Sequence, residues 1–182
     1  MTRPVDDDRF ELFAFWRTSA AFRVRVAFNL KGVRPRETFV DMDAGEQHGP
    51  AYRRISPLGG IPALIDHGPG QPPVPLTQSL AILEFLDELY PQPPLLPADA
   101  HGREHLRAVE QRLATEPGTG RFCHGDQPTM ADICLASLFM VTRVLKIDVD
   151  GIPTATRIVD ECGRLEAFAA AAPERQAGAP AA

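Results

Sequence analysis

The sequence is poor in cysteine, in positive charge and in long apolar runs, and each shortage excludes a class of protein. Cys123, Cys134 and Cys162 form no CxxC pair, which excludes a disulfide framework and a cysteine-rich zinc site. The formal net charge is -5, so no general attraction to nucleic-acid phosphates is expected. No apolar run approaches the roughly 20 residues that span a bilayer. We therefore expect neither a nucleic-acid nor a membrane partner.

The histidines and the N-terminal residues carry little further signal. His101 and His105 stand four apart on a predicted helix, but no third ligand is near, so a solvated helix face is favoured over a metal site. We expect no metal, and we interpret the three cysteines as small core residues. The first ten residues are acidic and lack the apolar stretch of a secretory signal, which favours a cytoplasmic protein.

The first ninety residues alternate in the order strand, helix, strand, loop, strand, strand, helix. We predict strands at 10–16, 37–42, 61–66 and PLTQ, helices at 20–31 and from Ser79, and a short helix within the loop 44–55. Gly32 ends the first helix. Leu80, Leu83 and Leu86 are expected on one buried side of the second. This order is that of a thioredoxin-like domain.

Prolines divide the chain after the first ninety residues, and helical patterns follow at 99–115, 129–145 and 154–171. The predicted fold is therefore a thioredoxin-like N-terminal domain followed by a reduced all-α C-terminal domain. Its boundaries are a domain at 8–90, a proline-rich linker at 91–98, a helical domain at 99–175 and a flexible tail at 176–182. Thr129 and Asp132 form a capping box whose role we interpret as structural.

The join between the first strand and the first helix places hydroxyl residues at a helix N-terminus. Thr18 and Ser19 occupy the N-cap position in FWRTSAAFRVR. Unpaired amides and the helix dipole favour an anion there, and they would favour a thiolate over its thiol. Taken alone, however, the pattern indicates only a helix cap.

Two further turns lie in suitable order along the chain. Ile61-Pro62 enters a predicted strand and is a candidate for a cis peptide bond, where the Ile61 backbone can pair with an extended peptide. Gln78-Ser79 opens the next helix and offers a second anion site, suited to an α-carboxylate. An ordinary turn and an ordinary cap are the alternatives.

Together, FWRTSAAFRVRVAFNLKG, SPLGGIPAL and TQSLAILEFLDELYPQPPLLPADAHGR resemble the zeta class of glutathione transferases. That class includes the maleylacetoacetate and maleylpyruvate isomerases. RFCHGDQPTMADICLA and ECGRLEAFAAAAPERQ resemble its later helices, so the resemblance covers most of residues 10–178.

The resemblance implies a glutathione site with a role for each matching residue. Thr18 matches the residue that faces the glutathione sulfur, Ser19 the next position, and Arg17 and Arg23 the flanking basic residues. Arg17 is also the remaining candidate for a substrate carboxylate. The other glutathione-binding positions are Gln47 for the glycyl carboxylate, Ile61 for the cysteinyl backbone with Pro62 in cis, and Gln78 with Ser79 for the γ-glutamyl end.

Three departures from the family pattern bear on function. Ala20 and Ala21 replace polar residues of the helix-start motif, and Val144 aligns with a basic residue, Arg143 being one position earlier. Between HGREHLRAVEQ and FCHGD about two helices, roughly 40 residues, are missing compared with an ordinary helical hairpin. In the family that segment supplies much of the substrate pocket and of the dimer interface.

Three functions therefore remain open. The first is a glutathione-dependent isomerase or transferase acting on a small dicarboxylate or electrophile, and the resemblance allows a homodimer. The second is a glutathione-binding protein with little catalysis, because the substrate-pocket helices are missing. The third is a degraded family member that is only marginally folded.

Overall fold

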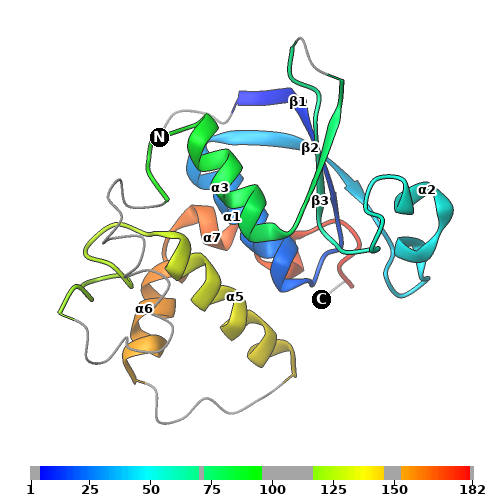
Figure 1. The fold of residues 1–182 in the computed structure, drawn as a ribbon. Coiled ribbons are helices and arrows are strands. Elements are labelled where there is room, and N and C mark those ends of the chain that lie inside the picture. The colour runs from blue at the N-terminus through cyan, green and yellow to red at the C-terminus, as the bar shows by residue number, and fades with distance from the viewer. Residues whose placement is uncertain (1–4, 70–71, 96–116, 146–152, 181–182) are drawn as a thin grey trace.

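The computed structural model describes residues 5–69, 72–95, 117–145 and 153–180 (Figure 1). A four-stranded sheet in the order β2-β1-β3-β4 forms the first domain, with β1 parallel to β2 and the other pairs antiparallel. The strands are β1 (Val5–Ala14), β2 (Val33–Phe39), β3 (Ala63–Asp66) and β4 (Val74–Thr77). This confirms the predicted thioredoxin-like domain.

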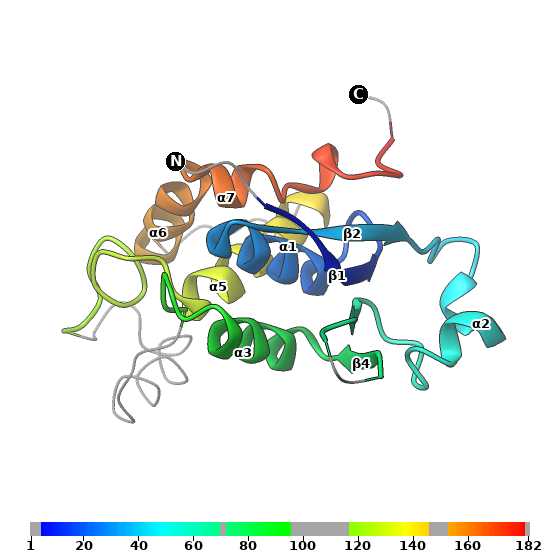
Figure 2. The ribbon, with the colours of Figure 1, turned by 90° about the horizontal axis from the view of Figure 1, so that it is seen from above.

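Strand β1 separates two cores because its side chains alternate between the faces of the sheet. Phe10 and Leu12 are fully buried in the main core with helices α1 (Ser19–Lys31) and α3 (Ser79–Leu89). Figures 1 and 2 show these two helices side by side, and they are in contact. Phe13 packs on the other face against Tyr52 of the short helix α2 (Pro50–Arg53), which follows the 3-10 turn Glu46–His48.

Strand β2 differs from its prediction, since it was expected at 37–42. The left-handed Gly32 (φ 68°) ends α1, and Val33 pairs at once with Val5 of β1. β2 lies at the edge of the sheet, where the exposed Arg34 and Arg36 are tolerated. An apolar run is therefore a poor guide to its start. Strand β1 likewise begins five residues earlier than predicted.

The predicted buried face of α3 is wrong at Leu80, which is 47% exposed. Each step of three residues turns a helix by about 300°, so Leu80 lies about 120° from Leu86. Ser79, Ile82, Leu83 and Leu86 are the buried positions instead, and they follow the i, i+3, i+4, i+7 pattern.

The second domain consists of helices in the described residues. They are α5 (Met130–Leu145), α6 (Pro153–Gly163), the short α7 (Glu166–Ala169) and a 3-10 turn at Pro173–Arg175. α5 packs against α1 and α6 (Figure 1). The helix predicted at 154–171 is interrupted because the backbone of Leu165 is extended. The predicted helix 99–115, His101 and His105 lie outside the described residues.

Asp132 joins the start of α5 to the segment before it. Its buried carboxylate accepts hydrogen bonds from the Thr129 N–H and hydroxyl, each 2.8 Å, and from the Cys123 N–H at 2.7 Å. The capping motif is therefore structural, as interpreted. Thr129 differs from the expected box in donating its hydroxyl to Asp132.

Two residues of the tail predicted at 176–182, Gln176 and Gly178, contact other parts of the described chain. The Gln176 amide donates to the carbonyls of Ala170 and Ala172, both at 2.8 Å. Gly178 lies against the ring of Phe39, so close that a Cβ there would lie 2.3 Å from it. In the described part of the chain, no helix has the length and apolar character needed to cross a membrane.

Candidate functional site

The N-terminus of α1 is capped by Thr18, as predicted. Its backbone is extended, and its Oγ1 accepts a hydrogen bond of 3.2 Å from the Ala21 N–H. Because this bond uses a lone pair of the oxygen, the hydroxyl hydrogen of Thr18 is left to donate. Ser19 follows as the first helical residue. The helix therefore begins with a hydroxyl donor and with amides that favour negative charge.

Two arginines fix the loop before Thr18. Arg17 forms an exposed 2.6 Å ion pair with Asp43, and its guanidinium lies over the Trp16 ring, 5.5 Å from the ring centroid. Arg25 is buried, pairs with Glu37, and donates to the carbonyls of Phe15 and Trp16. Arg25 thereby holds the turn that leads from β1 into α1.

The N-terminus of α3 brings three helices together around Arg23. Arg23 Nε donates to Ser79 Oγ of α3 at 3.0 Å, and Arg23 Nη1 donates to Ser137 Oγ of α5 at 2.9 Å. Within the described residues, no carboxylate forms an ion pair with this half-buried guanidinium. A positive charge away from bulk water and next to neutral hydroxyls is a favourable place for an anion.

Gln78, which precedes Ser79, has a backbone φ of 71°. Among the described residues it is the only non-glycine residue with a positive φ. This conformation costs on the order of 1–3 kcal/mol and is found most often at ligand sites and turns under constraint. The strained turn points to a functional requirement at the join between β4 and α3.

A cavity of about 130 Å³ lies between the N-termini of α1 and α3 and the loop before β3. Five residues of the predicted site form part of its wall, namely Arg23, Ile61, Pro62, Gln78 and Ser79. The lining residues are Ala20, Arg23, Ser56, Pro57, Leu58, Gly60, Ile61, Pro62, Thr77, Gln78 and Ser79. Arg17, Thr18, Ser19 and Gln47 lie outside this lining.

The loop that enters β3 is held by two hydroxyl groups that bind the same carbonyl. The Tyr52 hydroxyl and the Ser56 hydroxyl both donate to the Gly60 carbonyl, at 2.7 and 3.0 Å. The Ile61-Pro62 bond is cis, as predicted. The Ile61 N–H and C=O make no hydrogen bond to the described part of the chain. They are therefore available to an extended peptide.

Gln47 lies behind this loop and is 9% exposed. Its Nε2 is 3.2 Å from His48 Nε2 and 3.5 Å from the Met42 carbonyl, while its buried Oε1 has no hydrogen-bond partner among the described residues. Gly59 (φ 70°) passes so close that a Cβ would lie 2.9 Å from the Gln47 carbonyl oxygen. Glycine is required at position 59, and the Gln47 amide is incompletely satisfied.

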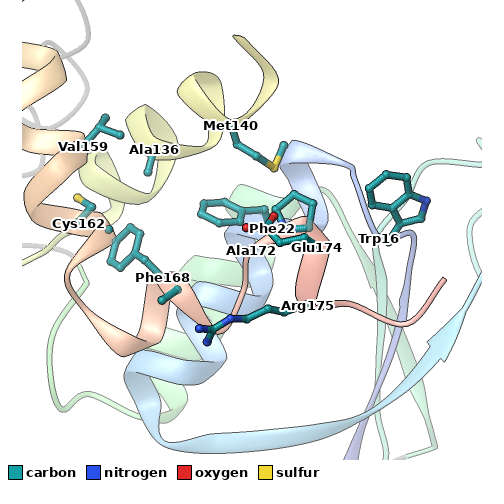
Figure 3. A pocket seen from close by; sticks show the side chains of 13 residues that line it. Trp16, Phe22, Ala136, Met140, Val159, Cys162, Phe168, Ala172, Glu174 and Arg175 are labelled. Atoms are coloured by element: carbon teal, nitrogen blue, oxygen red, sulfur yellow. The ribbon is translucent and has the colours of Figure 1, made fainter. Parts of the chain in front are cut away.

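A second cavity of about 400 Å³ lies on the other side of α1 and is largely apolar (Figure 3). Phe22 of α1, Met140 of α5 and Phe168 of α7 point into this space (Figure 3). Trp16 lines it from the β1–α1 loop, and Glu174 and Arg175 lie along its wall. None of the residues that the structure describes lines both cavities.

Comparisons with known proteins agree with this architecture. Residues 19–89 match the N-terminal domain of glutathione S-transferases, and residues 87–171 match the C-terminal domain. Maleylacetoacetate isomerase from Rhizobium meliloti is 31% identical, with 90% of this chain and 96% of that protein covered. The chain belongs to the zeta class of glutathione transferases.

Solved structures of this class have the same fold. A maleylacetoacetate isomerase from Methylobacterium extorquens, with malonate and glutathione bound, is 39% identical with a TM-score of 0.86. It is matched over 94% of this chain and all of that one. A zeta-class bacterial maleylpyruvate isomerase is 30% identical with a TM-score of 0.86, over 93% of this chain and all of that one.

This zeta-class chain is internally shorter than its relatives. Glutathione S-transferase Z1 from Arabidopsis thaliana is 30% identical, and the alignment covers 96% of both proteins. It runs over 217 positions, whereas this chain has 182 residues, so at least 35 positions have no residue here.

Two positioning residues were missed from the sequence. Ser137 lies in the middle of α5 and Arg25 inside α1, and neither has a local motif that predicts its partner. The cysteines, by contrast, were predicted to be core residues. Cys123 and Cys162 are buried, whereas Cys134 is only partly buried. Burial raises the pKa of the Cys123 and Cys162 thiols, with Asp132 adding to the effect. They are therefore poor nucleophiles.

Proposed function

We propose that this chain is a glutathione-dependent cis–trans isomerase of the maleylacetoacetate or maleylpyruvate type. The observation that carries the proposal is the cavity beside α1, where Arg23 lacks a carboxylate partner in the described residues and contacts Ser79. Such a wall suits the α-carboxylate of a γ-glutamyl group. The named relatives include both kinds of isomerase, and solved relatives bind glutathione.

Each part of glutathione has a chemically suitable partner in this proposal. Ser79, Gln78 and Arg23 hold the γ-glutamyl end, and the backbone of Ile61, next to Pro62, pairs with the cysteinyl unit. The glycyl carboxylate is assigned to the Gln47 amide, whose present contacts of 3.2 and 3.5 Å are long and easily exchanged.

Thr18 and Ser19 are assigned to the sulfur. The free hydroxyl hydrogen of Thr18 and the α1 amides lower the energy of a thiolate relative to the thiol. Bound glutathione supplies that thiolate, whose reversible addition to a carbon–carbon double bond permits rotation before it leaves. The role of the protein is to keep the sulfur ionised and positioned against the second substrate.

We assign the second substrate to the apolar cavity. Trp16 lines this cavity, and Arg17 stacks on Trp16, which makes Arg17 the candidate for a substrate carboxylate. To bind it, Arg17 exchanges its exposed partner Asp43 for the substrate, and this exchange costs little because surface ion pairs contribute at most about 1 kcal/mol.

The test is isomerisation of maleylacetoacetate with and without glutathione, compared among wild type, Thr18→Ser and Thr18→Val. We expect a glutathione-dependent rate in wild type and Thr18→Ser. Thr18→Val keeps the shape but lacks the hydroxyl, so its rate falls by about tenfold or more and the pKa of the bound thiol rises. The absence of any glutathione-dependent rate in wild type would rule out the isomerase.

A glutathione-binding protein with little catalysis is the second candidate. It is favoured by the missing alignment positions, which we place in the helical domain between HGREHLRAVEQ and FCHGD. Binding of glutathione without turnover of any maleyl substrate supports this candidate, and turnover rules it out.

We further propose a cytoplasmic homodimer. Leu58 is 88% exposed beside the cavity, and Leu80 is 47% exposed on α3, so both are suited to a contact with a second copy. Light scattering with size-exclusion chromatography tests this. A dimer that Leu58→Glu converts to a monomer supports the contact, and a monomeric wild type rules it out.

A further inference from the structure

Arg23 connects the two domains as well as lining the cavity. It is the point where α1, α3 and α5 meet, through Ser79 on one side and Ser137 on the other. Ser137 is fully buried, and its own hydroxyl donates to the Cys134 carbonyl at 2.7 Å. Its oxygen is thereby left to accept from Arg23, so its orientation is fixed by its own helix.

The arrangement also determines what Ser79 can do. Ser79 Oγ accepts a hydrogen bond from Arg23 Nε and makes no other side-chain hydrogen bond to the described residues. Its hydroxyl hydrogen is therefore free to donate, and Ser79 lines the cavity at the start of α3. A donor hydroxyl, a guanidinium and a helix N-terminus together suit a carboxylate.

We infer that Ser137, a residue of the second domain, is a positioning residue for glutathione. It holds Arg23 against Ser79, and this contact directs the Ser79 hydroxyl into the cavity toward the γ-glutamyl α-carboxylate. Glutathione affinity therefore depends on a residue that lines neither cavity. The inference rests on the proposed function, because it takes glutathione as the ligand of this cavity.

The test is calorimetric titration of glutathione into wild type, Ser137→Ala, Arg23→Gln and the double variant. Ser137→Ala removes a hydrogen bond to Arg23 and none to glutathione itself, so only part of that loss reaches the ligand, and the dissociation constant should be about three- to tenfold higher. The double variant should bind no more weakly than Arg23→Gln, because Ser137 acts only through Arg23. Leu138→Ala, at the half-exposed neighbouring position, is the control and should bind as wild type does.

An analogue identifies the end of the ligand that is involved. 4-Aminobutyryl-cysteinylglycine lacks only the α-carboxylate of the γ-glutamyl group. Wild type and Ser137→Ala should bind this analogue equally. Thermal unfolding accompanies each titration, and Ser137→Ala should remain folded because alanine favours a helix interior.

The outcomes separate the inference from the proposed function. Unchanged glutathione affinity in Ser137→Ala, or an equal loss for glutathione and the analogue, overturns the inference and leaves glutathione binding intact. Failure of wild type to bind glutathione at millimolar concentration overturns the proposed function first, and the inference with it.

Discussion

The two cavities beside α1 differ in size, chemistry and origin. The smaller cavity, about 130 Å³, is built from helix N-termini and the loop before β3, all in the first domain. The larger, about 400 Å³, takes Phe22 and Trp16 from the first domain and most of its wall from α5, α6, α7 and the tail. A polar and a largely apolar lining are therefore separated in space beside α1.

The difference depends on consecutive residues of one helix. Phe22 faces the apolar cavity and Arg23 the polar one, because each residue turns the helix by about 100°. A single helix thus supplies both walls. A substitution can therefore disable both cavities, one of them, or neither.

The largest effect is expected from Asp87→Ala, which should disable both cavities together. Asp87 accepts from the fully buried Lys31 ammonium at 2.6 Å and from the Leu95 N–H at 2.7 Å, joining α1, α3 and the linker. The variant leaves the buried Lys31 ammonium without its carboxylate partner, with only the neutral Pro93 carbonyl still accepting from it, which costs about 3–5 kcal/mol. Urea unfolding measures this, with the exposed Glu88→Ala as control. If Asp87→Ala unfolded at the same urea concentration as wild type, Asp87 would not be the residue that anchors both cavities.

Ser79→Ala should disable the polar cavity only. Loss of a hydroxyl donor to a carboxylate costs about 1.5–3 kcal/mol, so glutathione should bind about 10- to 100-fold more weakly. Calorimetry measures the affinity, and Glu84→Ala, exposed on the same helix, is the control. An unchanged affinity would mean that α3 does not hold the γ-glutamyl end.

Ala172→Leu should affect the apolar cavity only. The larger side chain occupies space that the second substrate needs, so its KM should rise about tenfold, while glutathione affinity stays at the wild-type value. Trp16 is the only tryptophan and lines this cavity, so its fluorescence reports occupancy directly. A rise in the dissociation constant for glutathione would show that the cavities are not independent.

The smallest effect is expected from Tyr52→Phe, beneath the polar cavity. Its hydroxyl supports the Gly60 carbonyl, which Ser56 also supports, so the loss should be about 1 kcal/mol. Burial raises the pKa of Tyr52 to about 12.

Because the pKa of Tyr52 is raised, its contribution to stability depends on pH. Between pH 10 and 12 the unfolded tyrosine loses its proton and the folded one keeps it, so wild-type stability should fall as pH rises through that window. Unfolding curves across the window measure this, and Tyr52→Phe should lack that part of the decline. If wild type and Tyr52→Phe lost the same stability between pH 10 and 12, the loss would come from groups other than Tyr52.

The polar cavity was predictable because its parts are local. The cis bond at Ile61-Pro62 and the Gln78-Ser79 join each follow from a few adjacent residues, as does the Thr18 cap, which lies outside the cavity lining. The roles of these residues toward glutathione stay predictions. Ser137 could not be found this way, because its partner Arg23 lies 114 residues earlier in the chain.

The apolar cavity was not predictable for the same reason. Met140, Phe168 and Trp16 come together only when α5 and α7 pack on α1. Arg17 was assigned to a substrate from its position beside Thr18, yet its charge is directed to Asp43. Leu80 was placed on the buried side with Leu83 and Leu86, but residues at a spacing of three drift around a helix, and Leu80 is therefore exposed.

The helical phase of α1 also limits how this stretch of chain can change its length. One residue inserted or deleted between Thr18 and Phe22 would rotate the rest of the helix by about 100° relative to its cap. Arg23 would leave Ser79, and Phe22 would leave the apolar cavity. Residues here can be exchanged one for another, but their number is fixed, which makes α1 a poor place for insertions or grafted loops.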